Sequence, residues 1–164
     1  MAVWQFSFFL VPEEFLEETY GHVPTSISAE ARREGDYFRQ VALSIDKLLP
    51  YLKQIGTLDA NSWEGSAYYH GKADNNATVY FEEETNHVCE IYCRLDIRQF
   101  DETFIFAILS LAAAFNCQFM TGNGQLFEPT LPALLQAIEQ SNATRFVTDP
   151  LKFLEDLSRD APAT

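Results

Sequence analysis

The stretch Val88–Arg98, VCEIYCRLDIR, constrains the fold of this chain more than any other. From position 89 to 98, apolar and polar residues alternate one by one: Cys89, Ile91, Cys93, Leu95 and Ile97 against Glu90, Tyr92, Arg94, Asp96 and Arg98. A period of two puts successive side chains on opposite faces of a β-strand, whereas a helix would scatter these apolar residues around its circumference. The stretch therefore predicts a strand with one buried face and one solvent-facing polar face.

Length and composition predict one globular domain. A chain of 164 residues can bury roughly two-thirds of its unfolded surface, and a hydrophobic content of 47% excludes disorder as a global description. We expect a single α+β domain over residues 1–164, with residues 13–34 partly in loops and a frayed tail at 159–164. Its antiparallel sheet should have about four to five strands, with three to four helices packed mainly on one face.

Short turn sequences separate the expected strands. Residues 64–71, 77–83 and 88–98 are joined by the turn-forming segments 72–76 and 84–87, so an antiparallel meander is expected. A further strand should run through Trp4, Phe6, Phe8 and Leu10 and end at Pro12. Residues 117–121 predict another short strand.

Capping residues mark the expected helices. Asp36 precedes a periodic apolar pattern that predicts a helix from 37 to 55, with Pro50 as the point of a bend. Asp101 and Thr130 should cap helices over 102–116 and 131–140. Asp149 and Pro150 are typical of a helix start and predict a last helix to 158, after a short extended piece at 145–147. A short helix is also expected at 13–19.

The charge balance restricts the classes of partner. With 24 acidic against 11 basic residues the net charge is −13, which disfavours nucleic acid and anionic lipid and favours a basic protein. The longest apolar stretch, 104–115, is too short to span a membrane. The cysteines Cys89, Cys93 and Cys117 are interpreted as buried thiols in a reducing compartment, so we expect a cytoplasmic protein.

The sequence contains no recognisable catalytic or metal-binding motif. His22, His70 and His87 do not stand at metal-ligand spacing, and there is no nucleophile elbow, phosphate-binding loop or dinucleotide fingerprint. We therefore expect no metal, no cofactor and no catalytic residue. The sequence gives no positive indication of enzyme activity.

The polar side of the predicted sheet supplies the candidate partner-binding residues, because tyrosine and arginine commonly anchor protein interfaces. These residues are Tyr80, Glu82, Glu90, Tyr92, Arg94, Asp96 and Arg98, with Tyr68 or His70 adjacent. Two other interpretations stay open. The alternating charges could form an internal ion-pair ladder of little energetic value, or a helix could cover this face and bury the charges as a paired network.

Three short motifs carry a family resemblance. They are W-x-F-x-F-x-L-x-P at Trp4–Pro12, D-Y-F at Asp36–Phe38 and R-L-D-I-R at Arg94–Arg98. Together with small size, acidity and few cysteines, they resemble uncharacterised immunity proteins that accompany secreted bacterial toxins. The resemblance implies a stoichiometric inhibitor that blocks a cognate toxin, and the acidity suits a toxin with a basic groove.

Two other functions are compatible with the same residues. One is a structural or regulatory homodimer that pairs through the sheet face or an edge strand. The other is a small-ligand binder or enzyme with a site in the loops at 13–34 or 121–130.

Overall fold

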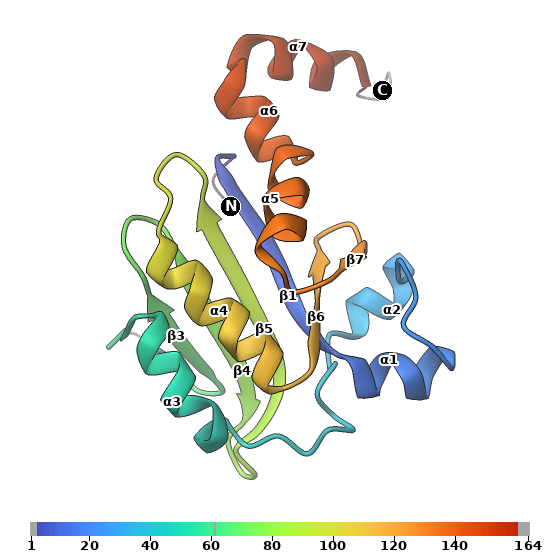
Figure 1. The fold of residues 1–164 in the computed structure, drawn as a ribbon, viewed down its shortest axis with the longest axis vertical. Coiled ribbons are helices and arrows are strands. Elements are labelled where there is room, and N and C mark those ends of the chain that lie inside the picture. The colour runs from blue at the N-terminus through green and yellow to red at the C-terminus, as the bar shows by residue number, and fades with distance from the viewer. Residues whose placement is uncertain (1–2, 61, 161–164) are drawn as a thin grey trace.

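A computed structural model describes residues 3–60 and 62–160 and shows an α+β fold, as the sequence predicted (Figure 1). All strands belong to one antiparallel sheet with the order β2-β3-β4-β5-β1-β6-β7. The strands are β1 (Gln5–Pro12), β2 (Thr57–Leu58), β3 (Ser66–His70), β4 (Asn76–Glu82), β5 (His87–Asp96), β6 (Cys117–Thr121) and β7 (Leu126–Phe127). The expected four to five strands were too few, because two-residue strands extend both edges.

Seven helices are present in the described residues, more than the three to four expected. They are α1 (Glu13–Tyr20), α2 (Ala29–Glu34), α3 (Ile45–Ile55), α4 (Glu102–Ala114), α5 (Leu131–Glu139), α6 (Asn142–Thr148) and α7 (Pro150–Asp160). The extra elements are short helices, each begun by a local cap. Ser28 accepts a hydrogen bond from the Ala31 amide at the start of α2, and Ser141 accepts one from the Thr144 amide at the start of α6.

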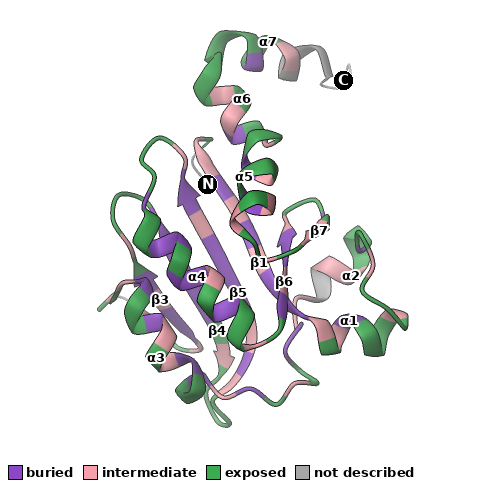
Figure 2. Cartoon of the chain, viewed as in Figure 1, coloured by how far each residue is buried: buried purple, intermediate pink, exposed green. Residues whose placement is uncertain are grey.

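The hydrophobic core lies between one face of the sheet and the helices α3 and α4 (Figures 1 and 2). Strand β5 contributes Ile91, Cys93 and Leu95 to this core, and α4 contributes Phe104 and Ile108, all at most 3% exposed. The alternation predicted for the central strand is therefore confirmed on its apolar side from Ile91 to Leu95. Burying each large apolar side chain is worth about 1.5–3 kcal/mol before chain entropy is subtracted.

The helix expected from residue 37 begins only at Ile45, where the Ser44 side chain accepts a hydrogen bond from the Asp46 amide. Residues 37–44 instead run beside β5. The Phe38 amide donates to the Cys89 carbonyl (3.3 Å), and the Val88 amide donates to the Leu43 carbonyl (2.8 Å). Residues 37–42 form turns, and Ser44 makes an isolated bridge to His87. The apolar residues of the expected helical stripe, such as Tyr37 and Phe38, are thus buried by tertiary contacts, which override the local pattern.

The C-terminal part also differs from expectation. Residues 145–147 are helical within α6, not extended, and the last helix runs past 158, so Arg159 and Asp160 are helical. The remainder of the expected frayed tail, 161–164, lies outside the described residues. The helices α5, α6 and α7 form an arm that extends beyond one end of the sheet (Figure 1).

We predict that Ile91→Ala lowers the free energy of unfolding by about 2–5 kcal/mol, because it opens a cavity in the core. Arg94→Ala, on the other face of the same strand, should cost less than about 1 kcal/mol. Urea denaturation followed by circular dichroism measures both. Equal losses in the two variants would show that the faces are misassigned.

Candidate functional site: the open face of the sheet

The face of β3, β4 and β5 that points away from α3 and α4 is the candidate site, and we call it the open face. Its side chains are Ser66, Tyr68, His70, Asn76, Thr78, Tyr80, Glu90, Tyr92, Arg94 and Asp96. None of these residues belongs to the hydrophobic core, although several are buried by their neighbours. Within the described residues, the helices that contact β3 and β4 approach from the opposite face (Figure 1).

Cross-strand register brings aromatic and guanidinium groups together on this face. Tyr68 and Tyr92 flank Thr78 in one row, and Arg94 lies in the next row along β5. The Arg94 guanidinium lies 5.0 Å from the centre of the Tyr92 ring, and its Nε–H donates to the Tyr92 hydroxyl (3.3 Å). Burial raises the pKa of Tyr68 and of Tyr80, and Arg94 partly offsets both shifts.

The seven predicted partner-binding residues do not share one environment. Tyr80 and Arg98 are exposed, Glu90 and Arg94 are half-buried, and Glu82 is exposed at the turn between β4 and β5. Two expectations of a solvent-facing position were wrong: Tyr92 is 9% exposed and Asp96 is 3% exposed. Tyr92 is buried because Phe9 of β1 packs on it, with ring centres 4.9 Å apart.

Asp96 is buried because it organises one corner of the sheet. Its carboxylate accepts hydrogen bonds from the Arg98 amide (3.0 Å), Nε (2.9 Å) and Nη2 (2.6 Å). The same guanidinium pairs with Asp74 (3.1 Å) and stacks 4.2 Å from the Trp4 ring centre. The Arg98 hydrogen bonds hold the pKa of Asp96 below its usual value. The Asp96–Arg98 pair therefore stabilises the fold. The interpretation of the alternating charges as an internal ion-pair ladder anticipated this pairing in part.

Glu90 occupies the opposite end of the open face. Its carboxylate lies so close to Gly35 that a Cβ there would stand 3.3 Å from Oε2. Burial raises the pKa of Glu90 to about 7. Burial is the main cause of the raised pKa values of Tyr37 and Tyr80, and the negative charge of Glu90 raises both pKa values further. Glu90 is thus a carboxyl group that titrates near neutral pH between two tyrosines.

A β-bulge changes the expected alternation below Glu90. Tyr80 pairs with Glu90 but Phe81 pairs with Val88, so Cys89 is the extra residue. Val88 therefore takes the core position, and Cys89 is half-buried instead of buried as expected, while Cys93 and Cys117 are buried as expected. Burial, Asp36 and Glu82 raise the pKa of the Cys89 thiol, which makes it a weak nucleophile.

Comparisons with known proteins add no relative to this geometry. No protein-family model, curated protein or solved structure matches the chain. Among the described residues, no group of three or more histidine, cysteine or acidic side chains is placed to hold a metal ion. None of the helices in the described ranges combines the length and apolar character that a bilayer-spanning segment requires.

A histidine–aspartate pair lies at the outer edge of the face. His70 Nε2 and Asp59 Oδ2 are 2.5 Å apart, and the Tyr68 ring packs edge-on against His70. The nearby Ser62 hydroxyl donates to the Asp59 carbonyl (2.8 Å) and accepts from the Tyr68 amide (3.0 Å). Because that hydroxyl is committed to the backbone, this arrangement fastens the loop before β3 instead of activating a nucleophile.

Sequence reasoning missed Trp63 as a candidate. Its side chain is 66% exposed, and it lies next to the start of β3, where its carbonyl accepts from the Ser66 amide (2.9 Å). The sequence already indicated an exposed position for Trp63, because a tryptophan among Asp59, Ser62 and Glu64 belongs to no alternating or helical pattern of apolar residues. Tryptophan is highly buried on average and is enriched among the residues that dominate interface energies.

We predict that Glu90→Gln changes the pH dependence of stability. Because the carboxyl pKa is about 7 in the folded chain and about 4.5 when unperturbed, the contribution of Glu90 is fully present below pH 4.5 and is lost as pH rises through 7. Glutamine cannot ionise, so the variant should gain about 1–2 kcal/mol at pH 8, an estimate reduced for partial exposure. Urea titrations at pH 4.5 and 8 measure this, with Glu64→Gln as the exposed control. A gain of the same size at both pH values would refute the assignment.

We predict that Asp96→Ala lowers the free energy of unfolding by about 2–3 kcal/mol, because it removes charge-assisted hydrogen bonds from a buried acceptor. Asp74→Ala removes the exposed partner of the same guanidinium and should cost less than about 1 kcal/mol. Thermal and urea denaturation of both variants give the comparison. A loss as large for Asp74→Ala as for Asp96→Ala would mean that the pairing with Asp96 is not the main contribution.

Proposed function

We propose that this chain is a non-enzymatic protein-binding module that inhibits a cognate basic protein stoichiometrically, in the manner of a bacterial immunity protein. The observation that carries the proposal is the open face, where tyrosine and arginine side chains lie ordered at the surface and no described helix covers them. Tyr80 and Arg94 form the centre of the proposed interface, and the buried Tyr92 ring supports Arg94. Tyr68 extends it on β3, and the exposed Trp63 lies in the chain just before that strand.

Order and chemistry both support binding at this surface. Arg94 is held against Tyr92 by a cation–π contact and a hydrogen bond, so less side-chain entropy is lost on binding. Tyrosine and arginine combine large contact areas with directed donors and are enriched among the residues that dominate binding energy. The exposed Tyr80 and the half-buried Tyr68 have polar hydroxyl groups that a partner can engage.

Charge supports a basic partner. The chain has a net charge of −13, and the exposed run Glu82, Glu83 and Glu84 lies at the β4–β5 turn, beside the end of the open face near Glu90. A cationic protein would be attracted over long range, and the association rate should fall as salt screens the field. In the complex, Arg94 pairs with an acidic side chain or a carbonyl group on the otherwise basic surface of the partner. The proposal places the chain in the cytoplasm, because its three cysteines are free.

We predict that a partner isolated by affinity purification on the wild-type chain is a single basic protein that binds one to one. The double variant Tyr80→Ala, Arg94→Ala should bind it about 100-fold more weakly, because two anchoring side chains are lost. Titration calorimetry with the purified pair measures the ratio and the stoichiometry. Phe106→Ala, an exposed aromatic on α4 at the opposite side of the molecule, is the matched control and should bind normally.

Two outcomes would contradict the proposal. One is a loss of binding in the Phe106→Ala control equal to that of the double variant, since the partner would then occupy the helical side. The other is a stable dimer of the free chain in light scattering that the double variant abolishes, which would assign the open face to self-association.

A further inference from the structure

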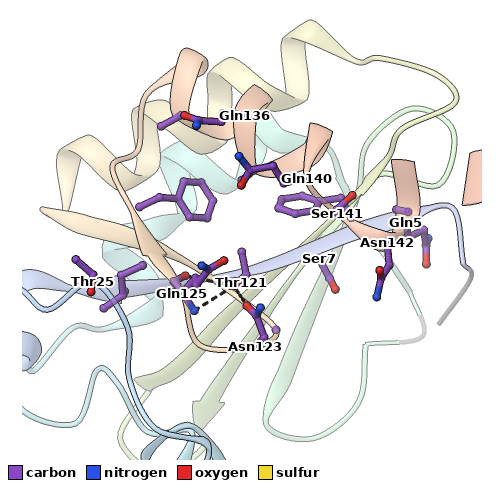
Figure 3. A pocket seen from close by; sticks show the side chains of 17 residues that line it. Gln5, Ser7, Thr25, Thr121, Asn123, Gln125, Gln136, Gln140, Ser141 and Asn142 are labelled. Atoms are coloured by element: carbon purple, nitrogen blue, oxygen red, sulfur yellow. Dashed lines mark hydrogen bonds between the residues drawn. The ribbon is translucent and has the colours of Figure 1, made fainter. Parts of the chain in front are cut away.

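A groove of about 590 Å³ lies between the C-terminal helices and the β6–β7 hairpin (Figure 3). Its floor is β1 around Ser7, one wall is α5 with the start of α6, and the other wall is the hairpin from Thr121 to Phe127. It shares no residue with the open face, and its volume is in the range of small-molecule sites. A ligand in the groove would therefore bind at a site separate from the interface of the proposed inhibitor.

The groove is uncharged although the chain is not. None of the described residues that line it is acidic or basic, whereas 35 of the 164 residues in the chain are Lys, Arg, Asp or Glu. A charged ligand would lose hydration there without meeting a counter-ion, which is costly. The groove therefore selects for neutral ligands.

Side-chain amides dominate its polar surface. The groove holds four of the chain's eight glutamines together with two asparagines: Gln5, Gln125, Gln136, Gln140, Asn123 and Asn142. Each amide offers both donors and an acceptor, and the Thr25 hydroxyl can also do both. The Thr121 and Ser141 hydroxyls are already hydrogen-bonded within the hairpin and at the start of α6. Gln5 Nε2 donates to the Asp74 carbonyl (3.3 Å), so this amide is engaged at the neighbouring corner of the sheet. The other five amides come from both walls of the groove and do not follow one line (Figure 3).

The hairpin wall is fixed in place before any ligand arrives. The Thr121 hydroxyl is hydrogen-bonded to Asn123 Oδ1, and it accepts a hydrogen bond from the backbone N–H of Gln125 (3.1 Å). The Ile27 amide donates to the Gly124 carbonyl (2.9 Å), and a Cβ at Gly124 would stand 2.5 Å from the Ile27 carbonyl oxygen. Only glycine permits that approach, at a φ of +89°. The close packing orders Asn123, which favours binding.

Apolar surface lies between the amides. Leu126 and Phe127 come from the hairpin, and Phe127 is held edge-on against Phe119 with ring centres 5.5 Å apart. Ala133 and Ala137, one turn apart on α5, keep space open beside Gln136 and Gln140. The ligand must therefore present both hydrogen-bonding groups and C–H surface.

We propose that this groove binds a neutral polyhydroxylated ligand of the saccharide class. Each sugar hydroxyl donates and accepts, which matches amides and hydroxyls, and the C–H faces of the ring fit the aromatic and alanine surfaces. A neutral extended peptide presents its polar groups along one direction. A ring with hydroxyl groups all round matches amides that come from both walls of the groove.

Saturation-transfer NMR on the full chain tests the proposal with maltose, cellobiose and N,N′-diacetylchitobiose as probes. At least one disaccharide should receive saturation, and Ala137→Trp, which fills the groove, should abolish the transfer. Gln136→Leu should weaken the binding of that disaccharide roughly fivefold, because one amide hydrogen-bond partner is removed. Gln54→Leu changes another exposed helical glutamine, on α3, and should leave binding unchanged.

Circular dichroism confirms that each variant is folded. If Ala137→Trp unfolds, the double variant Gln136→Leu, Gln140→Leu takes its place, since both side chains are exposed. The proposal is overturned if no disaccharide receives saturation or if the groove variants bind like the Gln54→Leu control. It is also overturned if a neutral blocked peptide, N-acetyl-trialanine amide, binds with the same dependence on these variants while the sugars do not.

Discussion

The contact between the apolar side of β5 and the helices α3 and α4 determines the rest of the structure. Strand β5 stands at the centre of the sheet, with three strands on each side, and Ile91, Cys93 and Leu95 join its apolar side to the core. Because both helices pack on that side, the other face of β3, β4 and β5 is stabilised by contacts among its own side chains and by neighbours such as Phe9 on Tyr92. The alternation of apolar and polar residues along β5 therefore produces both the core and the candidate interface.

Those lateral contacts divide the open face into parts with different tasks. Asp96 and Arg98 form a closed cluster at one corner, and Glu90 is half-buried at the other end. Tyr80 reaches the surface beside Glu90, and the half-buried Arg94 lies between the two ends. A row that looks uniform in the sequence thus combines structural residues with residues that can meet a partner. The groove beside the β6–β7 hairpin differs again, because it is uncharged.

Much of the fold was predictable because it follows from local chemistry. The alternation in β5, the caps Asp101 and Thr130 and the start of α7 at Pro150 act within a few residues of the elements they define. The wrong predictions concern residues whose conformation is determined by contacts with residues distant in the sequence. Tyr37 and Phe38 follow a good capping residue, yet Tyr37 packs on Phe9 and Phe15 and Phe38 hydrogen-bonds to β5. The bulge at Cys89 and the burial of Tyr92 under Phe9 depend on pairing between strands. No local pattern encodes them.

Hydroxyl-radical footprinting tests the two-faced sheet most directly, because Tyr68 and Tyr69 are neighbours in the sequence that point to opposite faces. Tyr69 is 3% exposed beneath the helices, whereas Tyr80 on the open face is 37% exposed and Tyr68 is half-buried. Tyr80 and Tyr68 should both be oxidised faster than Tyr69, with Trp63 faster still. Protection of Tyr68 and Tyr80 equal to that of Tyr69 would contradict an open face.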